Sequence, residues 1–487
     1  MSYSIITSAQ TYLPVYHPVH VMTDSSSKTN QAFTYFVDIY SADTNVHIDR
    51  KPFPKRPVTG YGLYNLAPVL KSYIRPDLDI TPAATGFTLA PNYKFNYRTV
   101  FGERFTYWNF TDNYYDSGLV GFTSSSQSHS FKVGDQIIIS QDIPFTNGEY
   151  EGIKTIVSAS TYSIVTSQAW AGSTATEGGK IRYADGSSIS YSGLASGSTA
   201  FVFCAAFQPD TIKTFIGEDW VVGGGGVGSL ANLLTNAPSS FRIKGDAQAY
   251  LSTFGGNYAG RINVKTYASG VLVGSYVIEN YDPFNTGKQW YLVGVGPWNI
   301  ENSTYTVLSG PSTIFGASVD TYTVQMQRNI LGFPASSKIL TLKIDDRCTS
   351  YRRFDLLFMD KKGSWFPFTF QAKHNKSTKI NKSLYLKDSL YEIDGSTITY
   401  DTKNRGFDAY NLEQTTKYVV RSLEMTEQES EYFSELVSSP YVYWMSDVSN
   451  WTPVQIEDGD FAIFNSDSGL IQYQIGFTVA NKNVVPI

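Results

Sequence analysis

Alternation of apolar and polar side chains is the pattern that recurs along the 487 residues of this chain. Phe33, Tyr35, Val37 and Ile39 alternate with their neighbours, which predicts a strand over 33–40 with one face on a core. The run 131–139 is predicted to be a turn that feeds a strand, and further strands are predicted at 155–157, 162–165, 261–265, 271–278, 321–326 and 338–344. Runs with a helical period are rare, so we expect a mainly β chain.

The clearest predicted hairpin joins the apolar run 354–359 to 364–370 through the polar turn 360–363. Phe366, Phe368 and Phe370 fall on one face of its second strand. Pro367 has no backbone N–H, so this strand is predicted to lie at a sheet edge or to carry a bulge.

One convincing helix is predicted, over Glu427–Val437. Thr426 is its N-cap and Glu429 completes a capping box, while Pro440 ends it. Its apolar stripe consists of Tyr432, Phe433, Leu436 and Val437.

Prolines interrupt the pattern near the N-terminus. The stretch Asp49–Pro57 holds three prolines among Lys and Arg, which predicts an elaborated loop after the first strand. A short helical segment is predicted at Gly62–Tyr73, before Pro76.

Shifts in composition divide the chain into four predicted parts. They are an N-terminal β domain with a loop-rich extension (1–116 and 184–240), an inserted small β-module (117–183), a β-sandwich domain (241–375) and a C-terminal β domain (376–487) that holds the helix 427–437. The predicted fold class is therefore mainly β, with several antiparallel sandwich or barrel modules and one C-terminal helix.

Composition supports this fold class and excludes a helical bundle. Aromatic residues make up 15% of the chain and charged residues only 17%, against about 25% charged in ordinary soluble domains. Aromatic side chains suit a pleated, half-buried surface. The net charge is −5, so nucleic-acid binding by the whole surface is not expected.

The two cysteines cannot form a disulfide framework, and Cys204 lies inside an apolar run. The N-terminus lacks the pattern of a signal peptide, and nowhere do 18 uninterrupted apolar residues occur. We therefore expect neither secretion by a signal peptide nor a membrane segment.

His17 and His20 have a spacing that could bind zinc, but Pro18 between them argues against a helix and no Cys cluster or third His lies nearby. Ordinary histidines in a loop that enters a strand are the preferred interpretation.

Gly223-x-Gly225-x-x-Gly228 matches a dinucleotide fingerprint, and Asp246 follows at a suitable distance. Ser229–Thr235 is too short for the crossover helix that such a site requires, so a glycine loop is preferred. No metal or nucleotide cofactor is predicted.

The chain has one basic stretch. The preferred interpretation is that its lysines lie on edge strands and hairpin tips, where they prevent pairing with other strands. The alternative is a surface that binds nucleic acid or an acidic partner. The stretch comprises Arg347, Arg352, Arg353, Lys361, Lys362, Lys373, Lys376, Lys379, Lys382 and Lys387. Paired carboxylates for glycoside hydrolysis stay open, because their separation is a spatial fact. No Gly-x-Ser-x-Gly elbow occurs, and no catalytic residue is predicted.

The order of three segments resembles a family of virion structural proteins from tailed bacteriophages of Bacteroidetes hosts, including crAss-like phages. The segments are Tyr16–Val21 with the strand 33–40 and the loop to Gly60; the hairpin with Leu357, Phe358, Gly363, Trp365, Phe368 and Phe370; and the closing runs Ser439–Tyr443, Trp451–Ile456 and Tyr473–Phe477. The inserted module, Val133-Gly134-Asp135 to Gly179, also resembles small β-modules of phage tail proteins. The family builds tails, necks and baseplates, and offers no catalytic residues.

The resemblance implies a non-enzymatic structural component of a bacteriophage virion, a ring-forming tail or neck protein (tail barrel or baseplate). Its expected partners are further copies in a cyclic homo-oligomer and other tail, neck or portal-proximal proteins. Nucleic acid is expected only as DNA passing through a ring lumen. The expected location is the virion, assembled in the host cytoplasm. Exposed aromatic residues of the hairpin 365–370 are the predicted contact between copies. The alternative hypothesis is a tail-borne receptor-binding or glycan-depolymerising protein.

Overall fold

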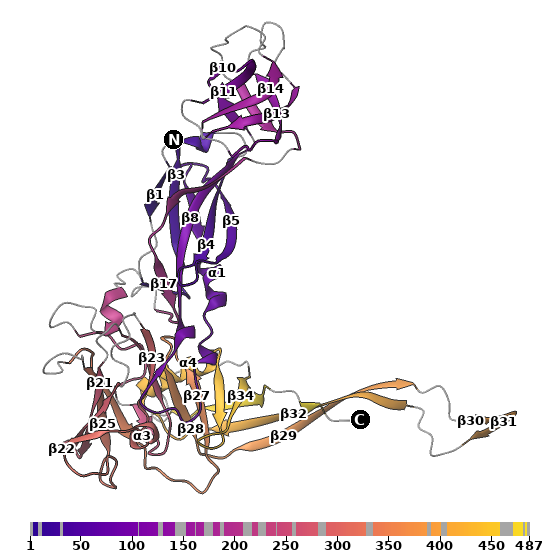
Figure 1. Cartoon of the computed structure of the whole chain (residues 1–487). Helices are drawn as coiled ribbons and strands as arrows, with labels where there is room; N and C mark the ends of the chain where they lie inside the picture. Colours follow the sequence, from indigo (N-terminus) through magenta and orange to yellow (C-terminus); the bar gives the residue numbers. More distant parts are fainter. Residues whose placement is uncertain are drawn as a thin grey trace. The chain divides into compact units, whose positions relative to one another are not determined.

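The structure is a computed structural model, and Figure 1 shows its elements. It describes residues 3–7, 12–29, 33–105, 107–124, 130–141, 152–160, 162–169, 179–185, 189–207, 217–222, 230–239, 241–255, 260–280, 289–327, 335–386, 391–400, 407–457, 471–480 and 483–484. The chain divides into two compact units, which are described separately. Unit 1 comprises Met1–Ile74 and Lys94–Cys204, and unit 2 comprises Arg75–Tyr93 and Ala205–Ile487.

About 55% of the described residues lie in strands and about 10% in helices, which confirms a mainly β chain with several antiparallel sheets. The described α-helices are α1 (Ala67–Leu70), α3 (Pro297–Glu301) and α4 (Glu427–Ser438). The described 3-10 helices are η1 (Ser26–Thr29), η2 (Lys71–Tyr73), η3 (Pro76–Leu78), η4 (Pro91–Tyr93) and η5 (Gly217–Trp220). A single C-terminal helix was therefore an approximation. Within the described ranges, no helix is both long and apolar enough to cross a membrane.

Unit 1 holds three sheets. The order β1-β3-β6 joins β1 (Tyr3–Thr7), β3 (His20–Ser25) and β6 (Gly62–Asn65). The order β2-β17-β8-β4-β5, with β16 beside β8, joins β2 (Tyr12–Pro14), β4 (Thr34–Ser41), β5 (His47–Pro54), β8 (Lys94–Phe105), β16 (Ile189–Ser196) and β17 (Ala200–Phe203). The order β10-β11-β14-β13-β12-β15-β9 joins β9 (Trp108–Phe110), β10 (Asp112–Asp116), β11 (Leu119–Thr123), β12 (Gln136–Gln141), β13 (Gly152–Ala159), β14 (Ser163–Ala169) and β15 (Gly179–Tyr183).

The N-terminal prediction needs two corrections. The predicted loop over Asp49–Pro57 is mostly strand, because β5 runs to Pro54. It is the terminal strand of its sheet, where a proline without an N–H costs no ladder hydrogen bond. The predicted helix over Gly62–Tyr73 begins instead as strand β6, and only α1 and η2 are helical, with a proline in the first turn of α1.

Gly62 explains why that segment is a strand. A Cβ there would lie 2.5 Å from the Phe53 ring and 2.6 Å from the Tyr35 ring, so only glycine lets β6 approach the sheet. Tyr35 on β4 stacks on Phe53 of β5 with ring centroids 5.6 Å apart. β4 is buried on both faces, since Asp38 on its second face is also only 1% exposed and binds Arg50 through two hydrogen bonds.

Unit 2 contains two large sheets and one small one. The large 12-stranded sheet has the order β29-β32-β35-β34-β33-β27-β28-β20-β23-β7, with β18 beside β20 and β36 beside β32. Its strands are β7 (Phe87–Leu89), β18 (Val221–Val222), β20 (Tyr250–Gly255), β23 (Gln289–Gly294), β27 (Phe354–Met359), β28 (Trp365–Phe370), β29 (Asn375–Leu386), β32 (Phe407–Arg421), β33 (Val442–Met445), β34 (Trp451–Ile456), β35 (Gln474–Val479) and β36 (Asn483–Val484). The six-stranded sheet, in the order β19-β26-β25-β21-β22-β24, contains β19 (Phe241–Ile243), β21 (Arg261–Ala268), β22 (Val271–Glu279), β24 (Thr306–Ser309), β25 (Thr321–Gln327) and β26 (Leu340–Ile344). β30 (Tyr391–Asp394) and β31 (Thr397–Tyr400) pair alone.

The predicted strands are present, as β4, β12, β13, β14, β21, β22, β25 and β26. The division into parts differs from the prediction, because the 12-stranded sheet runs through residue 375, where a boundary between two domains was expected. Apolar side chains from both large sheets and from α4 form one continuous core in unit 2.

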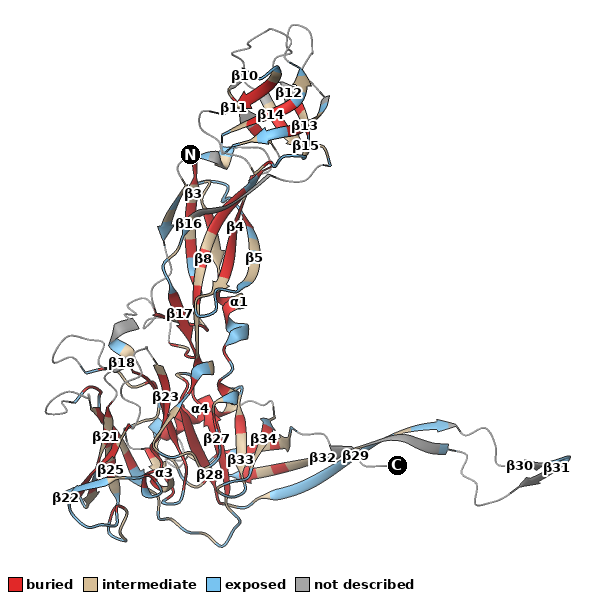
Figure 2. Cartoon of the chain, viewed as in Figure 1, coloured by how far each residue is buried: buried red, intermediate tan, exposed pale blue. Residues whose placement is uncertain are grey.

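The predicted hairpin and helix form the centre of that core (Figure 2). Thr426 and Glu429 make the expected capping box of α4. Phe366, Phe368 and Phe370 share one face, as predicted, and pack on the helix; the Phe368 and Phe433 ring centroids are 5.4 Å apart. Pro367 is tolerated because β28 pairs with β20 only through Trp365, near the start of the strand.

The expectation that this hairpin is the contact between copies is wrong. Trp365, Phe366, Phe368 and Phe370 are each 6% exposed or less. Their aromatic surface is used inside unit 2, under α4 and against the strands beside it.

A pair of aromatic substitutions tests the division between core and surface. Phe368→Ala should lower the free energy of unfolding by about 3–5 kcal/mol, because it empties a packed aromatic site. Tyr351→Ala is the control, because Tyr351 is 52% exposed, and should change stability by no more than about 0.5 kcal/mol. Urea unfolding followed by tryptophan fluorescence measures both. Equal losses would contradict the difference in burial between the two side chains.

Candidate functional site

The turn between β27 and β28 buries a carboxylate. Asp360 begins the turn and is 1% exposed. Its N–H donates to the Ser364 carbonyl at 2.7 Å, and the Gly363 N–H donates back to the Asp360 carbonyl at 3.0 Å. Gly363 has a φ of 91°, a conformation that a side chain would strain. The tight turn therefore holds the Asp360 side chain inside unit 2.

Each oxygen of the Asp360 carboxylate has donors from the chain. Oδ1 accepts from the backbone N–H groups of Lys362 and Ser364, both at 2.9 Å. Oδ2 accepts from the Thr235 hydroxyl at 2.6 Å and the Asn236 N–H at 3.2 Å. Asp360 thus connects its own turn to the segment before β19.

Helix α4 brings a second carboxylate to the same place. Glu435 is 8% exposed. Its Oε1 accepts from the Asn236 side-chain amide at 2.7 Å, and its Oε2 from the Lys361 N–H at 3.1 Å. Tyr432, one turn earlier, directs its hydroxyl to Asp360 Oδ2 at 3.4 Å. Three chain segments therefore meet around two acids.

A surface hollow of about 920 Å³ lies beside these groups. Phe207, Trp220 and Pro238 supply its apolar wall, and Glu431 and Lys361 are among its polar residues. Lys362 extends across this wall: its Nζ lies 5.0 Å from the Trp220 ring centroid and donates to the Thr235 carbonyl at 3.2 Å.

Burial changes the proton affinity of this cluster. Desolvation, with the nearby charge of Glu435, raises the pKa of Asp360 to about 7. Desolvation also lowers the pKa of Lys362. Groups of the turn, of Thr235–Asn236 and of α4 all reach the Asp360 carboxylate, so we interpret it as a group that fixes these three segments against one another.

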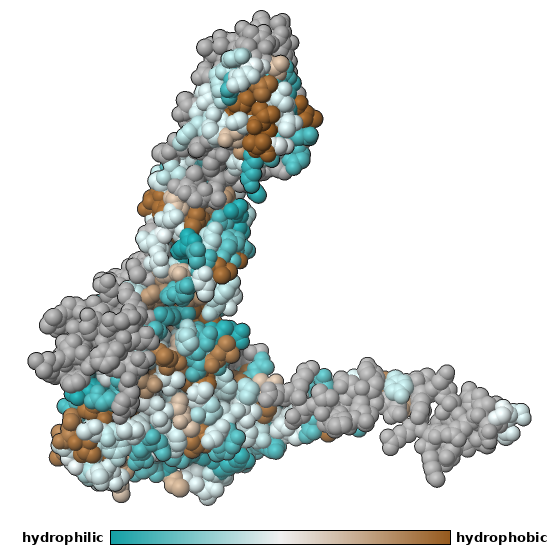
Figure 3. Space-filling view, viewed as in Figure 1, coloured by the Kyte–Doolittle hydropathy of each residue, from teal (hydrophilic) through white to brown (hydrophobic). Residues whose placement is uncertain are grey.

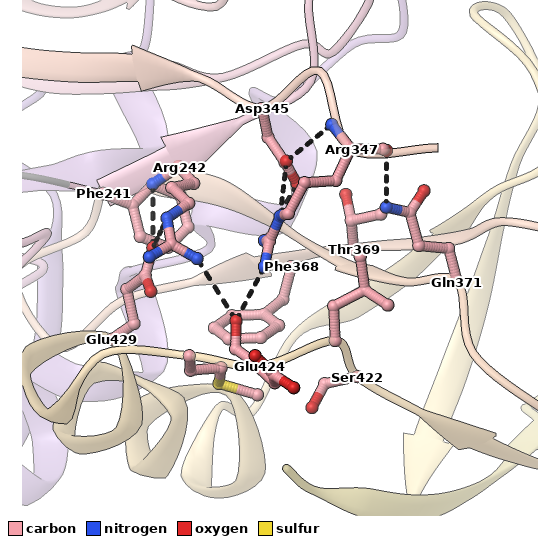
Figure 4. A pocket seen from close by; sticks show the side chains of 12 residues that line it. Phe241, Arg242, Asp345, Arg347, Phe368, Thr369, Gln371, Ser422, Glu424 and Glu429 are labelled. Atoms are coloured by element: carbon pink, nitrogen blue, oxygen red, sulfur yellow. Dashed lines mark hydrogen bonds and ion pairs between the residues drawn. The ribbon is translucent and has the colours of Figure 1, made fainter. Parts of the chain in front are cut away.

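A second, much smaller cavity of about 30 Å³ lies where β19 meets the start of α4 (Figure 4). Arg242 and Arg347 both donate to the Glu424 carbonyl, at 3.2 and 2.8 Å. Arg347 also pairs with Asp345 at 2.7 Å, and Arg242 lies 3.7 Å from Glu429. The cavity has room for about one water molecule, and its charged side chains join strands to the helix.

The predicted basic stretch separates into three groups, of which Lys361 and Lys362 in the β27–β28 turn have been described above. Arg347 pairs with Asp345, Arg352 lies over the Phe354 ring, and Arg353 bridges Asp246 and Asp355. The second group consists of four exposed lysines on or beside β29, which are Lys373, Lys376, Lys379 and Lys382. Lys387 lies outside the described residues.

β29 and β32 form a long ribbon, which we call the arm. Asn375 pairs with Val419 at its base and Leu386 with Phe407 at its far end. Outward from residue 375, β29 is exposed at nearly every described position, and Figure 2 shows the arm projecting from the buried part of its sheet. Ile380 and Leu384 are each 55% exposed. The lysines were identified from the sequence, but the two strands were not. The even spacing of Ile380, Leu384 and Leu386 could have predicted β29.

The predicted histidine motif belongs to unit 1. His17 lies in the bend between β2 and β3, and His20 begins β3. Among the described residues, no three His, Cys, Asp or Glu side chains are grouped so that they could hold a metal ion. The glycines 223–228 lie outside the described residues, Leu230–Thr235 after them is not helical, and Asp246 is bound to Arg353.

The raised pKa of Asp360 predicts a pH dependence. Between about pH 4 and pH 7 the folded chain keeps a proton that the unfolded chain has released, so the free energy of unfolding should fall as pH rises through this window. Each pKa unit corresponds to about 1.4 kcal/mol. Asp360→Asn, which resembles the protonated acid, should flatten the decrease in urea midpoint between pH 5 and pH 8. Asp346→Asn is the control, because Asp346 is exposed, and it should keep the decrease in urea midpoint. The same slope in the natural chain and in both variants would contradict the raised pKa of Asp360.

No family model matches the chain, and no curated protein matches it. Among solved structures, a match is a Ca²⁺-stabilized adhesin that helps an Antarctic bacterium reach out and bind ice. The identity is 10%, the match covers 87% of this chain and 95% of the adhesin chain, and the TM-score is 0.12. A TM-score this low does not indicate a common fold.

Proposed function

We propose that this chain is a non-enzymatic structural subunit of a bacteriophage virion, in a tail or neck ring held together by contacts between copies. The proposal has two supports. The first is the resemblance of the three ordered segments to virion structural proteins. The second, which carries most weight, is the arm, because it exposes apolar side chains on a ribbon that has little of the core to rest on.

The physical argument concerns stability. An isolated two-stranded ribbon is marginally stable in water. Among the described residues, β29 pairs only with β32, and β36 pairs with the other edge of β32 only at Glu413 and Gln414. Ile380, Leu384 and Phe407 on the arm are each more than half exposed. Burial of apolar surface is favourable at about 25 cal/mol per Å², so a second surface that covers the arm would stabilise it. A subunit of a larger assembly has such a surface.

The alternative is a tail-borne glycan-binding protein, for which exposed tyrosines would be the stacking groups. Tyr115 and Tyr162 are both exposed on the module of β9–β15. Tyr115 lies opposite Val120, whereas Tyr162 lies beside Ser124, about 13 Å further along β11 at roughly 3.3 Å per residue. These two side chains therefore do not form one stacking platform, and we favour the structural role.

The proposed role predicts a closed oligomer. Purified protein in native mass spectrometry should give one dominant integral multiple of the chain mass, and negative-stain images should show rings. In virions, an antibody or gold label on this chain should mark the tail or neck. A protein that stays monomeric at every concentration tested, or is absent from particles, would contradict the proposal. A glycan array with the same protein should give no selective signal.

A further inference from the structure

The two ends of unit 2 differ in a way that suggests how one copy meets the next. The arm projects on one side, and the six-stranded sheet ends on the other side with β22 and β24 (Figure 1). Both ends expose apolar side chains, and β29 and β24 are both terminal strands. An inference from these ends rests on the proposed ring-forming function and makes it more specific.

One face of the arm carries large apolar side chains, with the exposed Lys382 between two of them on β29. Ile380 and Leu384 lie four residues apart on β29 and so share a face. Position 386 is one further even step along β29 and pairs directly with Phe407 of β32, which places Phe407 on the same face. Ile380, Leu384 and Phe407 are 55%, 55% and 62% exposed. A stripe of large side chains therefore runs along one face towards the far end of the arm.

One face of the arm supplies part of a specific interface. Its 12 residues of β29 span roughly 40 Å at about 3.3 Å per residue, and two strands about 4.8 Å apart make a ribbon roughly 10 Å wide. One face then offers roughly 400 Å², about half of the approximately 800 Å² per partner of a standard interface, and the edges of the paired strands must add to it.

The opposite end of unit 2 carries an apolar edge. Val271 and Leu272 at the start of β22 are 69% and 50% exposed, and Val307 and Leu308 on β24 are 39% and 54% exposed. Within the described part of the chain, β24 pairs with β22 and with no other strand, so the backbone groups on its other side are available to a further strand. Figure 3 shows hydrophobic residues gathered where Figure 1 labels β22. We call this surface the β22–β24 edge.

Charge disfavours a contact between two arms. Lys376, Lys379 and Lys382 are all exposed on β29. If the β29 strands of two copies paired edge to edge, these rows of lysines would face each other, and like charges opposite one another destabilise a strand pair. The aliphatic β22–β24 edge has no such row, because the four residues of β24 are Thr306, Val307, Leu308 and Ser309.

We propose that the arm of one copy packs its Ile380, Leu384 and Phe407 face on the β22–β24 edge of the next copy. Two different surfaces meet in this contact, so it is heterologous and repeats head to tail, and it closes into a ring when the rotation per copy permits. β-Strand addition to the open edge of β24 gives main-chain hydrogen bonds, while the aliphatic side chains of both surfaces leave water.

Two complementary variants test the contact. The arm variant carries Ile380→Ser, Leu384→Ser and Phe407→Ser, and the edge variant carries Leu272→Ser, Val307→Ser and Leu308→Ser. Either alone should raise the concentration for half-assembly by more than about tenfold, which corresponds to roughly 1.4 kcal/mol per contact. Mixed together, the two variants should form a 1:1 heterodimer and nothing larger. The intact arm of the edge variant binds the intact edge of the arm variant, and the two surfaces left free in the heterodimer both carry the substitutions.

Controls separate this result from misfolding. Ile339→Ser with Tyr351→Ser removes two side chains that are 56% and 52% exposed elsewhere in unit 2, and should assemble as the natural chain does. Circular dichroism and thermal unfolding check that every variant is folded. In a Cys348→Ser background, since Cys348 is exposed, Leu384→Cys in one copy should form a disulfide with Leu308→Cys in another.

The outcomes decide between the two proposals. Normal rings from either the arm or the edge variant, or no heterodimer in the mixture, would overturn this contact while the ring-forming function stands. A natural chain that never assembles would overturn both. Loss of assembly in each variant, rescue to a heterodimer on mixing, and the disulfide between the Leu384→Cys and Leu308→Cys copies would together support the contact.

Discussion

Burial of the aromatic face of β28 under α4 is the interaction on which unit 2 depends. Phe366, Phe368 and Phe370 alternate along one face of the strand, and Phe433 and Tyr432 of the helix cover them. The Phe433 ring in turn stacks on Tyr473, with centroids 4.2 Å apart, next to β35. A single helix thus ties together strands that are more than one hundred residues apart in the chain.

The acids and arginines around α4 complete the same arrangement. Glu429 caps the start of the helix and lies near Arg242, whereas Glu435 accepts hydrogen bonds from Asn236 and Lys361 near its end. Polar groups that are buried need partners, and here the partners come from three different segments. Hydrophobic packing positions the helix, and these directional contacts fix its register against β19 and the β27–β28 turn.

Local signals made part of this structure predictable. The capping box of Thr426 and Glu429 and the alternation of Phe366, Phe368 and Phe370 are written in consecutive residues, and the structure confirms both. The prediction that the hairpin is a contact between copies was wrong. Alternation shows which residues share a face, but it does not show which surface covers that face. Asp360 and Glu435 could not be paired from sequence, since 74 residues separate Lys361 from the Glu435 that binds its N–H. The prolines of β5 predicted a loop. They are accommodated in a strand because β5 lies at the edge of its sheet.

The route of the chain between the units has a consequence for the order of folding. Residues 75–93 belong to unit 2, but unit 1 resumes at Lys94 and ends at Cys204. The contacts of the segment 75–93 with the rest of unit 2 come from much later in the chain, as when Asn299 donates to the Ala84 carbonyl across 215 residues. On a ribosome that delivers the chain from its N-terminus, unit 1 has all its described strands once residue 204 has emerged, while β7 still lacks β23. The first part of unit 2 to be synthesised therefore pairs with β23 only after the sequence of unit 1 is complete, and long-range pairing of this kind slows folding.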